Sequence, residues 1–122
     1  MPTILIVDDD ERNLKTVSDL VSVCMKITNI DMTIVHASHG AEAWAQITKP
    51  DSNVSVVISD VEMPNMSGPE LSKRIHEMHP EITVILISGR LEPEHHKAHA
   101  FIGKPLTMSE MLRVIRRLMK QK

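Results

Sequence analysis

The stretch VISDVEMPNMSG, residues 57–68, passes from an apolar run into a turn at a single acid. Asp60 is the first charged residue after the run Val54–Ser59, and Met63-Pro64 and Ser67-Gly68 follow it closely. The apolar run is typical of a buried strand, and the proline and glycine indicate the turn that ends it. Asp60 could therefore be a turn residue, a metal ligand or a nucleophile.

Apolar runs of this kind alternate with segments of helical periodicity along the chain. The predicted strands are Thr3–Val7, Met32–His36, Val54–Ser59, Ile82–Ile87 and Ala100–Ile102. The predicted helices lie at 14–24, 41–47, 67–78 and 107–120, with Ser67 capping the third and a Thr107/Glu110 capping box opening the last. This alternation predicts an α/β fold whose parallel sheet has helices on both faces.

Length and composition restrict the class of protein. The 122 residues predict one domain, 1–122, and a net charge of −2 argues against direct nucleic-acid binding. The single Cys24 excludes an internal disulfide and is expected to be a buried structural thiol. No apolar run reaches the ~18 residues that a membrane span needs, and the N-terminus is acidic rather than basic. We therefore expect a cytoplasmic protein.

Polar residues follow the predicted strands where the strands end. Asp8, Asp9 and Asp10 follow the first strand, Asp60 the third, Ser88 the fourth and Lys104 the fifth. In open parallel sheets, ligands bind beyond the carboxyl ends of the strands. Chain topology therefore predicts that carboxylates, a hydroxyl and an ammonium group meet at one edge of the sheet.

The chemistry of this predicted group is that of phosphoryl transfer. Clustered carboxylates repel one another, and a magnesium ion with oxygen ligands relieves the repulsion. A lysine and a serine hydroxyl can hold phosphoryl oxygens, so that positioning and charge neutralisation carry most of the catalysis. A carboxylate can itself accept the phosphoryl group and form an aspartyl phosphate.

Four motifs together resemble the response-regulator receiver domains of the CheY-like superfamily. They are ILIVDDDE at 4–11, VISDVEMPNMSG at 57–68, VILISG at 84–89 and FIGKP at 101–105. Each motif alone is weak, but the four occur in the family's order and at compatible spacing. The resemblance implies a flavodoxin-like, doubly wound five-stranded sheet of order 2-1-3-4-5, which is the strand order of this family.

The resemblance also assigns a metal site to particular residues. It implies that Asp60 is the phospho-acceptor and that Mg²⁺ binds beside it. Asp9 would bind the ion directly, Asp8 mainly through water, and Glu62 through its backbone carbonyl. Asp10, by contrast, is expected to cap the first helix or to be solvated.

Further residues take roles by the same resemblance. Ser88 would hydrogen-bond the phosphoryl group and Lys104 would pair with it, while Phe101 falls where the family often has a switch aromatic. The Lys104-Pro105 bond is cis in the family, which is energetically feasible before proline. In the family, the side chains at the positions of Glu62 and Arg90 flank the path of the attacking water.

One segment departs from the family pattern. Only 15 residues, Gly89–Gly103, separate Ser88 from Lys104, and they must hold a loop, a helix, a turn and a strand. With Pro93 near its start, the helix between the last two strands is predicted to be short or absent. In the family this helix belongs to the output and dimer face, so homodimerisation is left open here.

The histidines and the last helix offer alternatives to this interpretation. His95 with His99, or His76 with His79, could share a helical face, but no cysteine or carboxylate completes a zinc pattern. We expect surface histidines. The basic residues of the last helix, Arg113, Arg116, Arg117, Lys120 and Lys122, suit a solvated C-terminus, with partner binding as the alternative.

Two functions remain for the whole chain. In the first, the protein is a phosphorylation switch that takes phosphate from a histidine kinase or phosphotransfer protein and signals to a downstream protein by contact. In the second, it is a constitutive interaction module with the same fold. The acid, serine and lysine set favours the first. A hydrolase of small phosphate esters fits poorly, so we do not expect an enzyme that turns over a diffusible substrate.

Overall fold

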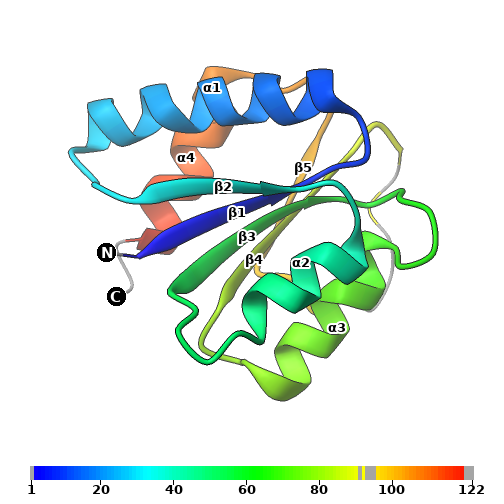
Figure 1. Ribbon diagram of the computed structural model, residues 1–122. Helices are drawn as coiled ribbons and strands as arrows, with labels where there is room; N and C mark the ends of the chain where they lie inside the picture. Colours follow the sequence, from blue (N-terminus) through cyan, green and yellow to red (C-terminus); the bar gives the residue numbers. More distant parts are fainter. Residues whose placement is uncertain (1, 91, 93–95, 120–122) are drawn as a thin grey trace.

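Five parallel strands form the centre of the molecule (Figure 1). The computed structural model describes residues 2–90, 92 and 96–119. The strands are β1 (Thr3–Val7), β2 (Thr33–Ala37), β3 (Val54–Asp60), β4 (Thr83–Ser88) and β5 (Ala100–Gly103). Their order in the sheet is β2-β1-β3-β4-β5, which confirms the predicted flavodoxin-like arrangement.

Helices cover both faces of this sheet. The described residues form α1 (Glu11–Thr28), α2 (Gly40–Ile47), α3 (Gly68–Met78) and α4 (Met108–Met119). Helices α1 and α4 lie on one face, and α2 and α3 lie on the other (Figure 1). Each face has its own apolar cluster, because alternate strand residues point to opposite sides of the sheet.

Polar side chains begin the helices, as the sequence predicted. Asp10 accepts a hydrogen bond from the Arg12 N–H at 2.8 Å, and so caps α1. Ser67 accepts from the Glu70 N–H at 3.3 Å and caps α3. The Thr107 hydroxyl oxygen likewise accepts a backbone N–H in the first turn of α4. These bonds satisfy donors that a helix start otherwise leaves free.

Several strands extend one residue beyond their predicted ends. Asp60 pairs with Ile87 in the β3–β4 ladder, and Ser88 pairs with Gly103 in the β4–β5 ladder. Apolar patterning stops at the first polar side chain, whereas backbone pairing continues through it. The acceptor candidate and the serine are therefore the last residues of strands. At the chain's end, the predicted helix limit at Lys120 lies outside the described residues.

The connection from β4 to β5 has no helix among its described residues, 89, 90, 92 and 96–99. Instead, the His99 N–H donates to the Val84 carbonyl at 2.8 Å, and the Val84 N–H donates to His99 Nδ1 at 3.0 Å. The prediction of a short or absent helix is thus confirmed for this part of the chain. Pro93, which motivated it, lies outside the described residues.

The prediction of surface histidines is wrong for two residues. The side chain of His96 is only 12% exposed. Its Nδ1 accepts the Ala98 N–H at 2.9 Å, and its Nε2 lies 2.9 Å from Glu92 Oε2. His79 is half-buried beside the ring of Trp44. The contact of His79 joins distant parts of the chain, whereas His96 is held by residues two and four positions away in the sequence. His95 lies outside the described residues.

Cys24 is buried in α1, as predicted, and its thiol donates to Met108 Sδ at 3.5 Å. Burial raises the pKa of this thiol, with a smaller opposing effect of Arg116. A buried thiol of raised pKa is a poor nucleophile, so Cys24 serves packing.

None of the helices in the described part of the chain is both long and apolar enough to cross a membrane.

Candidate functional site

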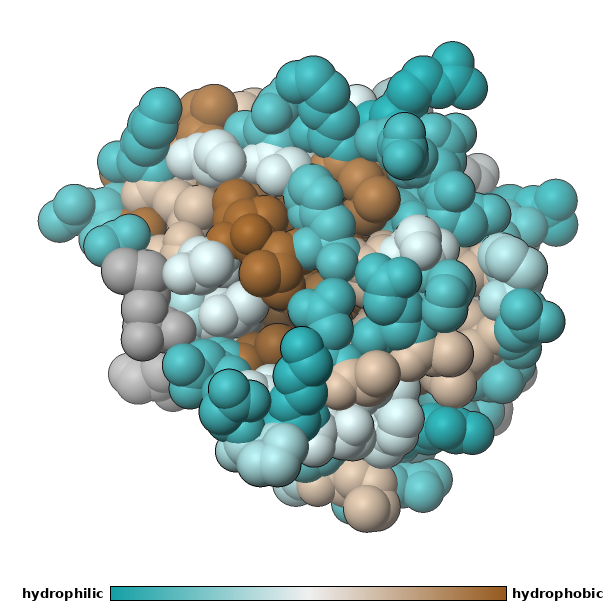
Figure 2. All heavy atoms as spheres, viewed as in Figure 1, coloured by the Kyte–Doolittle hydropathy of each residue, from teal (hydrophilic) through white to brown (hydrophobic). Residues whose placement is uncertain are grey.

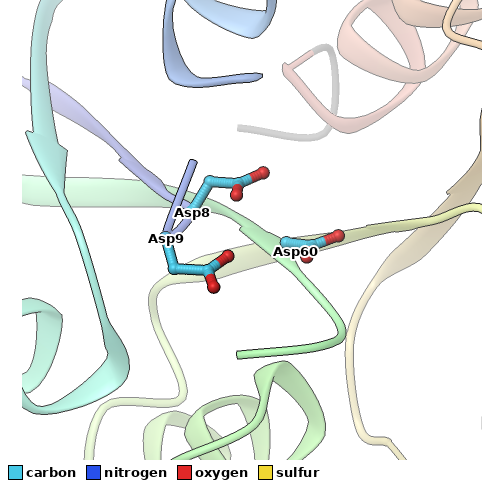
Figure 3. A group of neighbouring side chains, drawn as sticks. All are labelled: Asp8, Asp9 and Asp60. Carbon is cyan, nitrogen blue, oxygen red and sulfur yellow. The ribbon is translucent and has the colours of Figure 1, made fainter. Parts of the chain in front are cut away.

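Three carboxylates meet at the carboxyl edge of the sheet (Figure 3). Asp8 and Asp9 follow β1, and Asp60 ends the neighbouring strand β3. The β1–β3 ladder pairs Val7 with Ser59, so the residues after them lie side by side. One oxygen from each carboxylate lies within 4.8 Å of the others. The predicted acidic cluster is therefore present.

The Asp8 carboxylate is removed from solvent, at 4% exposure, and accepts the Asp10 N–H at 3.0 Å. Burial raises the pKa of Asp8, and the nearby Asp60 carboxylate raises it further. The hydrogen bond from Asp10 and the charge of Lys104 act in the opposite direction but do not cancel the rise. Ionised Asp8 is therefore short of compensating positive charge.

Asp60 is in a similar position. Burial raises the pKa of Asp60 most strongly, and Asp9 and Glu62 raise it further by repulsion. Lys104 offsets part of this rise, since its Nζ lies 3.4 Å from Asp60 Oδ1. One ammonium group cannot neutralise three carboxylates, so the cluster favours a bound cation.

The donor set suits magnesium. Carboxylate oxygens are ligands of hard divalent cations, and Mg²⁺ is usually held by one or two carboxylates together with waters and phosphate oxygens. Asp8, Asp9 and Asp60 supply these oxygens from two adjacent strands. Among the described residues they form the one group of three or more potential ligands of this kind. The ligand role of the Glu62 carbonyl stays a prediction.

Ser88 and Lys104 reach the same edge from β4 and from the end of β5. Ser88 is 1% exposed, and its Oγ accepts the Arg90 N–H at 3.0 Å. Among the described residues, the Ser88 hydroxyl hydrogen has no hydrogen-bond acceptor, so this hydrogen can be donated to a ligand. The Lys104 N–H donates to the Ser88 carbonyl at 2.8 Å, and the Lys104-Pro105 bond is cis, as expected.

Glu62 and Arg90 contact each other. Arg90 Nε lies 3.1 Å from Glu62 Oε1, with the two side chains 79% and 52% exposed respectively. Glu62 comes two residues after Asp60, and Arg90 comes two residues after Ser88. The ion pair therefore joins the loop after β3 to the segment after β4, beside the acidic cluster.

Phe101 lies on β5 and is half-buried against the apolar cluster under α2 and α3. It packs partly in the core. Its role as a switch aromatic stays a prediction.

Gly68, the first residue of α3, is a site residue that sequence reasoning missed. Its N–H donates to the Val61 carbonyl at 2.9 Å, which closes the loop after β3. A Cβ at this position would overlap the Asp60 carbonyl oxygen and press on Val61 Cα at 3.0 Å. Only glycine allows α3 to start so close to the acceptor strand. From the sequence, Ser67-Gly68 indicates only a turn and a helix cap.

A Gly68→Ala protein should be destabilised by about 1–3 kcal/mol, the usual cost of overpacking against a backbone that cannot move away. Chemical denaturation monitored by circular dichroism measures this loss. Gly89→Ala is the matched control, because a Cβ there would meet only Lys104 Cβ, at 3.9 Å. Equal stability of the two variants would contradict the account of Gly68.

Magnesium should stabilise the protein at neutral pH and have little effect near pH 4. The pKa values of Asp8 and Asp60 are raised in the fold, so ionising them costs stability as the pH rises above about 4, the pKa of an unfolded aspartate. The metal removes that cost only when the carboxylates are ionised. Thermal melts with and without Mg²⁺ should differ by about 3–6 °C at pH 7, the shift that about 1 kcal/mol produces in a domain of this size.

An Asp9→Asn protein provides the control for these melts. It keeps the shape of the exposed Asp9 side chain but removes one candidate ligand charge. Its gain in melting temperature from Mg²⁺ should be much smaller than that of the unchanged protein. A full gain in this variant, or an equal gain at both pH values, would contradict the proposed metal site.

Comparisons with known proteins agree with this geometry. Residues 4–116 match the family model of the response regulator receiver domain. The chain belongs to this family. It is 36% identical over 88 residues, 70% of this chain, to 3′,5′-cyclic-nucleotide phosphodiesterase regA of Dictyostelium discoideum. This receiver domain spans only 10% of regA, so the activity named for regA says nothing of this chain.

Two solved structures resemble the receiver domain over nearly its whole length. The signal receiver domain of an HD domain-containing protein from Pseudomonas fluorescens Pf-5 is 27% identical, with a TM-score of 0.82 and coverage of 98% of this chain and 88% of that chain. The BeF3-activated DrrB receiver domain is 25% identical, with a TM-score of 0.77 and 98% coverage of both chains. The receiver belongs to two-component signal transduction, which implies a kinase partner, and its acidic pocket is consistent with phospho-acceptance.

Proposed function

We propose that this receiver domain is a phosphorylation switch in which Asp60 accepts the phosphoryl group. The observation that carries the proposal is the cluster of Asp8, Asp9 and Asp60 within 4.8 Å, with Lys104 Nζ 3.4 Å from Asp60. An Asp60 oxygen attacks the phosphorus of a phosphohistidine. The bond from phosphorus to the histidine nitrogen breaks, and its electron pair leaves with the imidazole.

The other site residues support this transfer by holding charge in place. Asp8, Asp9, Asp60 and the Glu62 backbone carbonyl would hold Mg²⁺, which supplies positive charge for the transferring phosphoryl oxygens when it is bound. Lys104 neutralises a second oxygen, and the free hydrogen of the Ser88 hydroxyl is donated to a third. Because these groups are fixed before the reaction, little reorganisation is needed at the transition state.

The partners follow from this chemistry. The donor is a histidine kinase or a phosphotransfer protein, and the signal passes to a downstream protein by direct contact rather than to nucleic acid. Residues 1–122 act as a single receiver domain in the cytoplasm. The domain catalyses its own phosphorylation and dephosphorylation, without turnover of a diffusible substrate.

Intact-protein mass spectrometry after incubation with acetyl phosphate tests the switch. We expect one added phosphoryl group in the presence of Mg²⁺ and none after the metal is chelated. A constitutive interaction module is the alternative, and it would gain no phosphoryl group under either condition. Repeated hydrolysis of acetyl phosphate without phosphoprotein accumulation would instead favour a phosphatase.

A further inference from the structure

Strand β5 lies at the end of the sheet, so one of its edges has no neighbouring strand. The Lys104 N–H donates to Ser88 on β4 at 2.8 Å. The backbone N–H and C=O groups of successive strand residues point to opposite sides of the strand. Those of Ala100 and Ile102 therefore also point toward β4. Phe101 and Gly103 then direct their N–H and C=O groups to the open edge.

The described part of the chain leaves this edge without a strand partner. The connection before β5 has no helix in residues 89, 90, 92 and 96–99, and α4 lies on one face of the sheet rather than across its edge (Figure 1). In the same view, Figure 2 shows apolar side chains gathered near the centre of the visible face, with hydrophilic side chains around them. An unpaired edge strand is a template for strand addition by another chain.

One cation contacts the start of β5, and two more lie near it in the sequence or on α4. Arg117 Nη2 lies 3.5 Å from the His99 carbonyl at the start of β5, and Arg113 lies one turn earlier on the same side of α4. The exposed Lys97 precedes the strand by three residues. Two described acids lie in the same elements: Glu110, which pairs weakly with Arg113 at 3.7 Å across exposed side chains, and Glu92, which lies 2.9 Å from His96. The described cations near this edge therefore outnumber the acids, three to two, although the chain has a net charge of −2.

We propose that the open edge of β5 binds an extended, acidic segment of a partner protein as a sixth strand. The backbone groups of Phe101 and Gly103 supply the pairing, and Arg113, Arg117 and Lys97 select acidic side chains. A second copy of the chain is disfavoured, because two β5 edges side by side would bring like charges together. The described residues leave this edge unpaired without phosphorylation, so the proposal does not depend on the role of Asp60.

A short fluorescein-labelled peptide of alternating glutamate and valine tests the pairing on the unphosphorylated protein of residues 1–122. We expect saturable binding by fluorescence anisotropy, and NMR amide shifts concentrated at Phe101 and Gly103. The same peptide with N-methylated backbone amides should not bind, because it cannot form strand hydrogen bonds. Equal binding of both peptides would overturn the proposal, as would no binding or an absence of shifts at these two amides.

Charge reversal on α4 tests the selectivity. Arg113→Glu with Arg117→Glu should weaken peptide binding at least about tenfold. Arg116→Glu is the matched control on the same helix. The charge of Arg116 lowers the pKa of Cys24 in α1, so Arg116 lies on the side of α4 that faces α1. This variant should bind the peptide as the unchanged protein does, and equal weakening in both variants would overturn the proposal. A concentration-dependent dimer that the peptide dissociates would assign the edge to a second copy and would also overturn it.

Discussion

An Asp60→Asn protein is expected to gain no phosphoryl group from acetyl phosphate and Mg²⁺, a loss of at least about a hundredfold in the yield of phosphoprotein. The amide has the size of the carboxylate but lacks the nucleophilic oxygen that forms the acyl phosphate. It also removes one of the three carboxylate charges that would hold the metal. Intact-protein mass spectrometry over a time course measures the yield.

Asp10→Asn provides the control for this variant. It makes the same chemical change within the DDD run, and asparagine caps helices as well as aspartate does, so α1 should keep its start. Asp10→Asn protein should therefore be phosphorylated at the rate of the unchanged protein. Phosphate gain by Asp60→Asn at that rate would disprove the acceptor assignment, and loss in both variants would point to general damage of the acidic run.

The acidic cluster also affects the stability of the unphosphorylated domain. The pKa values of Asp8 and Asp60 are raised by burial and by neighbouring carboxylates, so their ionised forms are costly without a metal. A fold does not gain stability by collecting such groups, and natural proteins tolerate this cost at functional sites. On the proposed function, Mg²⁺ would relieve the repulsion between these carboxylates when it binds, because it supplies the positive charge that the cluster lacks.

Topology explains why so much of the site could be predicted from the sequence. Apolar runs and helical stripes fix the order of strands and helices, and parallel strands deliver the residues after them to one edge. Asp8, Asp9, Asp60, Ser88 and Lys104 all follow strands in this way, and the structure brings them together. Their chemical roles come from the residue types and from the family resemblance, and stay with the proposed function.

The missed features depend on contacts across the fold. Gly68 matters because α3 begins against the Asp60 carbonyl, a distance that no local pattern encodes. His99 accepts the Val84 N–H across fifteen residues of chain separation, and so takes part in holding the start of β5. His79 is half-buried for a similar reason, beside the ring of the distant Trp44. Sequence periodicity describes one element at a time and contains none of these distances.

The ion pair between Glu62 and Arg90 is expected to prolong the life of the aspartyl phosphate. In the double variant Glu62→Ala with Arg90→Ala, hydrolysis should be about tenfold faster, equivalent to about 1.4 kcal/mol of barrier. The two long side chains meet at 3.1 Å beside the acidic cluster, where the family's attacking water approaches. Loss of phosphoprotein mass after removal of acetyl phosphate gives the rate.

Two further variants separate shielding from simple charge effects. The Glu62–Arg90 pair is largely exposed, and such pairs contribute only about 0–1 kcal/mol to stability. We therefore attribute the slow hydrolysis to the bulk of the two side chains over the pocket rather than to the attraction between their charges. The exchanged pair, Glu62→Arg with Arg90→Glu, restores that bulk and should restore slow hydrolysis. Lys15→Ala with Asp19→Ala removes a comparable exposed pair on α1, at 3.1 Å, and should leave the rate unchanged. Equal rates in the unchanged protein and the Glu62/Arg90 alanine variant would refute the shield.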